Sequence, residues 1–206
     1  MTLHVNLDAA QGNGFADPVR SSQSVFRCVM NALARPGTIE TVADNVNAPA
    51  PLMPAAAALA LTLCDHDTPV WLDEKFAGEP GIAAWLRFQT GAPVLSDPRQ
   101  AAFAFIGSGA ALPPFDTFTL GTPDYPDRST TLVIQVDTLS EGPALPLSGP
   151  GIRGTSTLGA GTLPHDFAMR MQANRAMFPL GVDLVLVCGT QFVALPRSTH
   201  VAAKEI

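Results

Sequence analysis

Four arginines lie next to proline or glycine in segments typical of tight turns, and their side chains are well suited to bind an anion. The segments are Arg35-Pro36-Gly37, Asp127-Arg128-Ser129-Thr130, Gly151-Ile152-Arg153-Gly154 and Pro196-Arg197-Ser198-Thr199. A guanidinium on a stiff turn can hold a phosphate or carboxylate through two parallel hydrogen bonds, and equally a helix C-terminus or an acidic group of a partner. Arg128 is the strongest candidate, because it follows a long loop and precedes a buried strand. The candidate anion-binding residues are Arg35, Asp127, Arg128, Ser129 and Arg197.

The third of these segments also matches the G-x-G-x-x-G pattern of a dinucleotide-binding turn, over residues 149–154. That pattern requires a helix directly after the turn to face the pyrophosphate, and an acidic residue about 20 positions later for the ribose. Here Pro150 occupies the second position, the sequence that follows (TSTLGAG) is typical of a strand, and positions 168–175 contain no acidic residue. We therefore interpret the segment as a sharp loop that leads into a strand.

The remaining combinations of reactive side chains give weaker signals. The run Cys64-Asp65-His66-Asp67 offers four metal-capable groups, but neighbours in sequence rarely point to one centre and no second ligand pair follows at zinc spacing. The end of a helix is the simpler interpretation. Ser108 stands outside a G-x-S-x-G elbow, and none of the four histidines forms a local signature with a serine or cysteine. The sequence thus predicts no metal site, no cofactor site and no recognisable catalytic residue.

Composition limits the classes of protein to which the chain can belong. Its 206 residues fit one domain, and only 15% of them are charged against a usual value of about 25%, so we expect other chains to cover part of the surface. The net charge is −6 and the 12 basic residues are scattered, which argues against a nucleic-acid partner. The absence of a basic or apolar leader indicates a cytoplasmic protein without a membrane segment. The three cysteines are distant from one another, so we expect free, buried thiols.

Periodicity predicts helices alternating with buried strands. Helical patterns begin at Pro18 and stop at Pro36-Gly37, and they recur at 54–64, 80–89 and 162–178. Strand patterns occupy 38–42, 68–73, 101–106, 130–136 and 182–188, and a hairpin at Gly189-Thr190 leads into a further strand. Residues 107–128 form a long Gly- and Pro-rich excursion of the kind that often carries binding. We predict a layered α/β/α domain with helices on both faces of a mixed sheet.

Taken together, seven segments resemble the PhnH family, a subunit of the bacterial carbon-phosphorus lyase system. In chain order they are FRCVMNALARPGTI (26–39), LTLCDHDTPVWLD (61–73), FQTGAP (88–93), GTPDYPDRSTTLVIQV (121–136), LSGPGI (147–152), FPLGVDLVLV (178–187) and ALPRST (194–199). The resemblance implies a single PhnH-like domain over residues 1–206, and we expect loosely ordered tails at 1–16 and 201–206. It also identifies GPGI as a family loop rather than a nucleotide fingerprint.

The resemblance implies a role in phosphonate catabolism. Family members act in a cytosolic core complex with the G, I and J subunits, and they form homodimers in isolation. The G, H, I and L proteins together make α-D-ribose 1-methylphosphonate 5-triphosphate from ATP and methylphosphonate. The J subunit, an iron-sulfur radical enzyme, later breaks the C–P bond, and this chain lacks a cysteine set for such a cluster. The family fold is similar to that of pyridoxal-phosphate-dependent transferases.

Three functional hypotheses follow from these observations. The leading one is a non-catalytic structural or ligand-positioning subunit of the core complex. The alternative is a nucleotide- or phosphonate-binding subunit that contributes to catalysis, in which Arg128, with Arg35 or Arg197, holds ATP or the phosphonate. The third, pyridoxal-phosphate chemistry, requires a buried lysine for the Schiff base. The only two lysines are Lys75, in an acidic turn, and Lys204, near the C-terminus, so we expect this cofactor to be absent.

Overall fold

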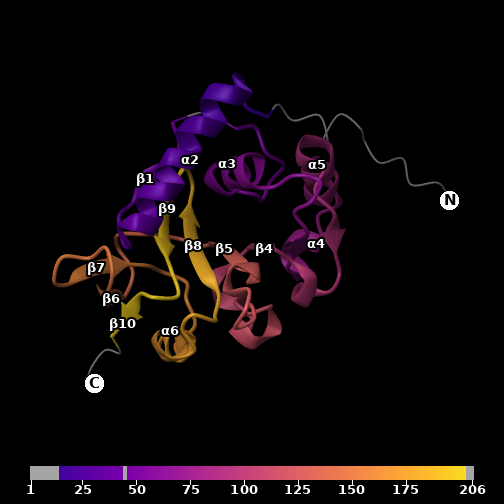
Figure 1. The fold of residues 1–206 in the computed structure, drawn as a ribbon. Coiled ribbons are helices and arrows are strands. Elements are labelled where there is room, and N and C mark those ends of the chain that lie inside the picture. Colours follow the sequence, from indigo (N-terminus) through magenta and orange to yellow (C-terminus); the bar gives the residue numbers. More distant parts are fainter. Residues whose placement is uncertain (1–13, 44–45, 203–206) are drawn as a thin grey trace.

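The computed structural model describes residues 14–43 and 46–202 (Figure 1). Its α-helices are α2 (Pro18–Ala34), α3 (Pro54–Leu63), α4 (Glu74–Ala77), α5 (Pro80–Thr90) and α6 (Phe167–Ala176). Its strands are β1 (Glu40–Thr41), β2 (Val70–Leu72), β3 (Val94–Leu95), β4 (Phe103–Ile106), β5 (Thr131–Gln135), β6 (Ala144–Ser148), β7 (Ser156–Gly159), β8 (Asp183–Cys188), β9 (Gln191–Leu195) and β10 (His200–Val201). Short 3₁₀ helices occupy Pro98–Gln100, Gly109–Ala111, Phe115–Thr117 and Pro126–Arg128. None of the helices described is long and apolar enough to cross a bilayer.

Local sequence signals explain where the longest helices begin and end. The Asp17 side chain caps α2 by accepting a hydrogen bond from the Arg20 N–H, and Pro18 takes the first helical position, where its missing N–H costs nothing. The same helix ends where Pro36-Gly37 interrupts the pattern, as predicted. In α3 the residues from Ala55 to Ala60 are all buried, which is the environment that its almost purely apolar sequence indicated.

A seven-stranded mixed sheet forms the centre of the domain, in the order β1-β9-β8-β5-β4-β2-β3. The five strands from β3 to β8 pair in parallel, whereas β9 and β1 add to one edge in antiparallel orientation. The helices α2 and α3 pack over one face, and α6 lies on the other (Figure 1). Alternate residues of the central strands feed the two apolar cores, as Val133 and Leu132 of β5 illustrate. The predicted mixed α/β sheet with helices on both faces is confirmed.

A second, three-stranded sheet in the order β10-β6-β7 was not predicted. Its central strand β6 contains Pro146, a residue that normally argues against a central strand because it cannot donate to the ladder. The structure accommodates this proline because β10 pairs in register only with Leu147 and Ser148, while Pro146 uses its carbonyl to accept from the Ala202 N–H. The strand predicted after the GPGI loop is present as β7.

Both ends of the chain are only partly described, and most of the two expected tails (1–16 and 201–206) lies outside the described residues. At the N-terminal end, Phe15 packs against the apolar core beneath α2 and α3. At the C-terminal end, Val201 is fully buried within β10, so the sheet extends one residue into the segment expected to be a tail.

Candidate functional site

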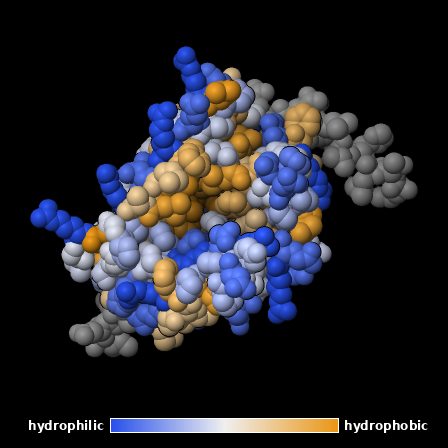
Figure 2. All heavy atoms as spheres, viewed as in Figure 1, coloured by the Kyte–Doolittle hydropathy of each residue, from blue (hydrophilic) through white to orange (hydrophobic). Residues whose placement is uncertain are grey.

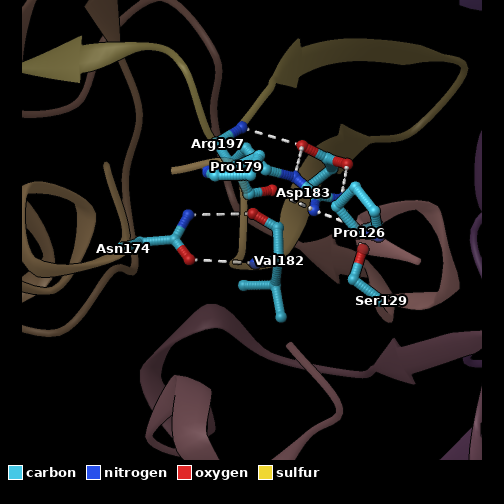
Figure 3. Close-up of polar contacts among 7 residues, drawn as sticks. All are labelled: Pro126, Ser129, Asn174, Pro179, Val182, Asp183 and Arg197. Carbon is cyan, nitrogen blue, oxygen red and sulfur yellow. Dashed lines mark hydrogen bonds and ion pairs between the residues drawn. The ribbon is translucent and has the colours of Figure 1, made fainter. Parts of the chain in front are cut away.

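Arg197 makes more side-chain hydrogen bonds than any other arginine selected from the sequence (Figure 3). Its Nε and one terminal nitrogen donate to the two carboxylate oxygens of Asp183, at 3.1 and 2.5 Å. The other terminal nitrogen donates to the backbone carbonyls of Pro126, at 2.8 Å, and Pro179, at 3.1 Å, and a fifth bond goes to the Ser129 hydroxyl. Its side chain is only 12% exposed. Since a guanidinium has five N–H donors, every donor of Arg197 is used within the chain.

This arginine cluster, defined as Pro126, Ser129, Pro179, Asp183 and Arg197, joins three segments that are distant in sequence. The 3₁₀ turn before β5, the turn before β8 and the turn after β9 all meet at the guanidinium (Figure 3). The Arg197 backbone N–H also donates to Asp183, at 2.8 Å, which fixes the start of the last turn. The arrangement is therefore that of an internal clamp between loops.

Asn174 of α6 holds the turn before β8 from the other side. Its side-chain amide donates to the Val182 carbonyl and accepts from the Val182 N–H, both at 2.9 Å, so one buried side chain satisfies both polar groups of a single residue (Figure 3). Gly181 has a φ of +125°, and a side chain there would collide with Asn174. The segment from Phe178 to Asp183 is thus pinned to α6 and to the arginine cluster.

The other residues selected from the sequence lie outside this clamp. Arg35 follows the last residue of α2 and is exposed. Asp127 is also exposed, and the Arg128 guanidinium stacks over the exposed ring of Tyr125, 4.1 Å from its centroid. Of the five candidates the structure therefore brings Ser129 and Arg197 together, places Asp127 and Arg128 beside them with their side chains at the surface, and leaves Arg35 apart.

A surface cavity of about 710 Å³ lies beside the clamp, and no motif in the sequence indicated it. It is lined by residues of α6, of the turn before β8, of the GPGI loop and of the last turn with β10, namely Pro150, Gln172, Arg175, Ala176, Phe178, Ser198 and His200. Arg175 and His200 lack any local motif, so only the fold brings them to one place. The cavity falls in the size range of ordinary small-molecule sites.

A smaller cavity of about 400 Å³ opens where β2 and β4 end. Strand order reverses between these two strands, because the chain goes from β2 to β3 on one side and then returns to β4 on the other. Lys75 lines this cavity, and its ammonium donates to the Gly107 carbonyl at 2.9 Å. Asp73 is buried and accepts from the N–H groups of Phe76 and Gly107, so its carboxylate serves to fix the two loops.

The three cysteines are free thiols in the structure, but the predicted burial holds only for Cys64, because Cys28 and Cys188 are partly exposed. Cys64 is buried, and burial raises the pKa of its thiol to about 12, with a further contribution from the Asp65 carboxylate. Cys28 is partly exposed, and burial followed by the charge of Glu40 raises the pKa of its thiol. Asp65, His66 and Asp67 remain at the surface after α3, and among the described residues no group of three metal-capable side chains converges.

Comparison with known proteins gives a consistent result over nearly the whole chain. The family model described as "Bacterial phosphonate metabolism protein (PhnH)" matches residues 13–202. The α-D-ribose 1-methylphosphonate 5-triphosphate synthase subunit PhnH of Rhizobium meliloti (strain 1021) is 48% identical over 185 residues, which are 90% of this chain and 92% of that protein. HtxG of Stutzerimonas stutzeri, provisionally named as a C-P lyase subunit protein, is 33% identical over 183 residues, covering 88% and 86% of the two chains.

Proposed function

Because the chain belongs to the PhnH family of bacterial phosphonate metabolism proteins, we propose that it is a subunit of α-D-ribose 1-methylphosphonate 5-triphosphate synthase in the carbon-phosphorus lyase system. The observation that carries this assignment is the 48% identity to a protein of that name over 90% of the chain. We further propose a cytoplasmic location and a role without a catalytic site of its own. The internal use of Arg197 and Asp183, the best-connected charged pair in the structure, supports the last point.

Partners of the proposed subunit are the G, I and J subunits of the core complex, with a homodimer as the state in isolation. An apolar stripe on the outer face of α2 supports a partner-binding role. Val19, Phe26 and Met30 are spaced seven and four residues apart, which places them on one side of the helix, and they are 68%, 49% and 52% exposed. Figure 2 shows apolar residues in the region that α2 occupies and around a hollow in the middle of the same face. Large apolar side chains exposed together mark interaction surfaces.

Co-expression with tagged G, I and J subunits tests this role. We expect the wild-type chain to co-purify in a defined complex, and the double variant Phe26→Ser with Met30→Ser to lose either this complex or the homodimer. The matched control is Gln23→Ala with Ser24→Ala, which changes exposed polar positions on the same helix. A wild-type chain that stays separate from all three subunits would show that the proposed role is wrong.

Anion binding by the loop arginines is the second candidate function. The observation that favours it is the exposed guanidinium of Arg128, which is held over Tyr125 and makes no ion pair among the described residues. A charge-assisted contact contributes about 1.5–3 kcal/mol, so Arg128→Ala should weaken binding of ATP or methylphosphonate at least roughly tenfold. Calorimetry that detects no binding of either compound by the wild type would remove this candidate.

The architecture is also proposed to be that of the pyridoxal-phosphate-dependent transferases, supported by the mixed seven-stranded sheet with helices on both faces. We do not propose that the chain binds pyridoxal phosphate. Of the two lysines, Lys75 has its ammonium bonded to a backbone carbonyl at the surface, and Lys204 lies outside the described residues. A visible absorbance band after soaking with pyridoxal phosphate that disappears in Lys75→Ala would contradict this view.

A further inference from the structure

The cavity of about 400 Å³ lies where the neighbouring parallel strands β2 and β4 end and their loops part. The loop after β2 leads into α4 and α5, whose Phe76 and Trp85 belong to the apolar core beneath α2 and α3. The loop after β4 leads to Leu112 and Phe115, which belong to the core on the opposite face of the sheet. Loops that leave neighbouring parallel strands towards opposite faces keep a crevice open between them, and ligands of open α/β sheets bind in such crevices.

The two walls of this crevice are tied to each other. Asp73 is only 5% exposed, and its two carboxylate oxygens accept from the N–H groups of Phe76, at 3.0 Å, and Gly107, at 2.9 Å. The Lys75 ammonium donates to the Gly107 carbonyl at 2.9 Å, and a side chain at Gly107 would collide with the stem of this lysine. The crevice is therefore held in one shape, which lowers the entropy that a ligand must overcome on binding.

Three polar groups of the lining keep hydrogen-bonding capacity for a ligand. The Glu74 carboxylate and the Ser108 hydroxyl make no hydrogen bond or ion pair within the described part of the chain. An ammonium has three donors, and the one bond of Lys75 to a neutral carbonyl leaves two of them and the positive charge available. The cavity thus offers both a free carboxylate and a free cationic group to the same ligand.

An aromatic ring and the balance of charge favour a cationic group on the ligand. Trp71 lines the cavity, and its ring is oriented by an edge-to-face contact with Phe118, with 5.6 Å between the ring centroids. An ammonium beside an aromatic face is stabilised by the ring quadrupole. Asp73 and Glu74 place two carboxylates in the lining against the single ammonium of Lys75. The volume lies near the lower end of the range for small-molecule sites, which favours a small ligand.

We infer that this cavity binds a small zwitterion, a molecule of simple amino-acid size that carries both an amine and an acidic group. Glu74 is assigned to the amine, with the Trp71 ring beside it, and Lys75 and Ser108 are assigned to the acidic group. An amine alone leaves Lys75 without a counter-charge, and an acid alone meets the negative charge of Glu74. The inference goes beyond the proposed subunit role and does not depend on it.

Titration of the isolated full-length protein with glycine, β-alanine and γ-aminobutyrate tests the inference, because these zwitterions differ only in the spacing of their two charges. Propylamine and propionate are the matched compounds with one charge each. Tryptophan fluorescence reports on the site, since Trp71 lines the cavity and the second tryptophan, Trp85, is fully buried. We expect at least one zwitterion to bind saturably, and about tenfold or more tightly than propylamine or propionate, with calorimetry giving the same dissociation constant.

Two substitutions separate the roles of the charged groups. Glu74→Gln removes the negative charge at nearly constant size and should weaken binding of the zwitterion about tenfold or more, while binding of propionate does not weaken. Lys75→Met keeps most of the stem and should weaken binding of the zwitterion to a similar extent, while binding of propylamine does not weaken. Glu79→Gln is the matched control, because Glu79 is an exposed glutamate before α5 outside the lining, and it should change the dissociation constant less than about twofold.

Circular dichroism establishes that each variant is folded, which is expected because Glu74 and Lys75 are exposed. Absence of saturable binding for all three zwitterions, equal binding of a zwitterion and its singly charged counterparts, or a Glu74→Gln variant that binds like the wild type would each overturn the inference. Since the isolated chain is titrated, none of these results bears on whether the protein co-purifies with the G, I and J subunits.

Discussion

Replacement of Arg197 is the most direct test of the arginine cluster as a structural clamp. Arg197→Ala removes five hydrogen bonds and leaves Asp183, whose side chain is only 25% exposed, without its counter-charge. Removing one partner of a buried ion pair costs about 3–5 kcal/mol, and the partial exposure here favours the lower end. Arg197→Lys keeps the charge, but an ammonium has three donors and cannot span the five acceptors, so we expect a loss of about 2 kcal/mol.

Urea denaturation followed by tryptophan fluorescence and circular dichroism measures these losses. With a slope of about 2–3 kcal/mol per molar urea, a loss of about 3 kcal/mol lowers the midpoint by roughly 1–1.5 M. A double-mutant cycle with Asp183→Asn should give a coupling of more than about 1 kcal/mol, whereas Arg20→Ala, which breaks a highly exposed ion pair on α2, should barely move the midpoint. An Arg197→Lys variant that unfolds at the wild-type midpoint, or a coupling near zero, would refute the clamp.

Three further changes test other parts of the structure. Gly151→Ala should lower the free energy of unfolding by at least about 2 kcal/mol in the same urea assay, because the new methyl group meets the backbone carbonyl at the end of α2. Gly154→Ala is the control, because Gly154 also has a positive φ but lies in open space, and this change should lower the free energy of unfolding by only about 1 kcal/mol. Asn174→Ala leaves both backbone groups of Val182 unpaired and should lower thermal stability by about 2–4 kcal/mol, and an unchanged melting temperature would contradict the assigned bonds. The raised pKa of the Cys64 thiol means that the unfolded chain loses this proton first, so the associated stability is complete below about pH 9 and is lost as the pH rises towards 12. Cys64→Ala should therefore show a shallower decline in stability over that range, and the wild-type Cys64 should react with a thiol reagent more slowly than the other two cysteines.

The elements predicted most accurately are those whose ends and faces depend on local physics. The start of α2 was predictable because Asp17 and Pro18 form a cap and a first turn without help from distant residues. The central strands β5 and β8 were predictable because burial on both faces requires a continuous apolar run. In α6 the prediction began at Thr162, five residues too early, because the apolar spacing continues into the turn that precedes the helix.

The elements that were missed depend on pairing between distant segments. The sequence of β6 does not predict a strand, because Pro146 argues against one. The proline is tolerated in the fold because its partner β10 is short and pairs only with the residues after it. The partners of Arg197 could not be predicted for the same reason. The sequence shows that the arginine lies on a stiff turn, but not that the fold brings Asp183 and the Pro126 carbonyl within hydrogen-bond distance of it. Guanidinium chemistry was therefore predictable, and its target was not.

The arginine cluster and the neighbouring cavity show how one signal in the sequence can point to two roles. The turn that carries Arg197 is held because several groups converge on its guanidinium, and the same convergence consumes the donors that a ligand would need. Arg197 follows this logic, since its five bonds hold the loops whose other residues, Phe178 and Ser198, line the cavity. The Arg128 guanidinium differs, because it stacks over Tyr125 at the surface and makes no ion pair among the described residues. The number of donors that the fold leaves free thus decides whether an arginine on a turn supports a site or binds a ligand, and for Arg197 that number assigns support.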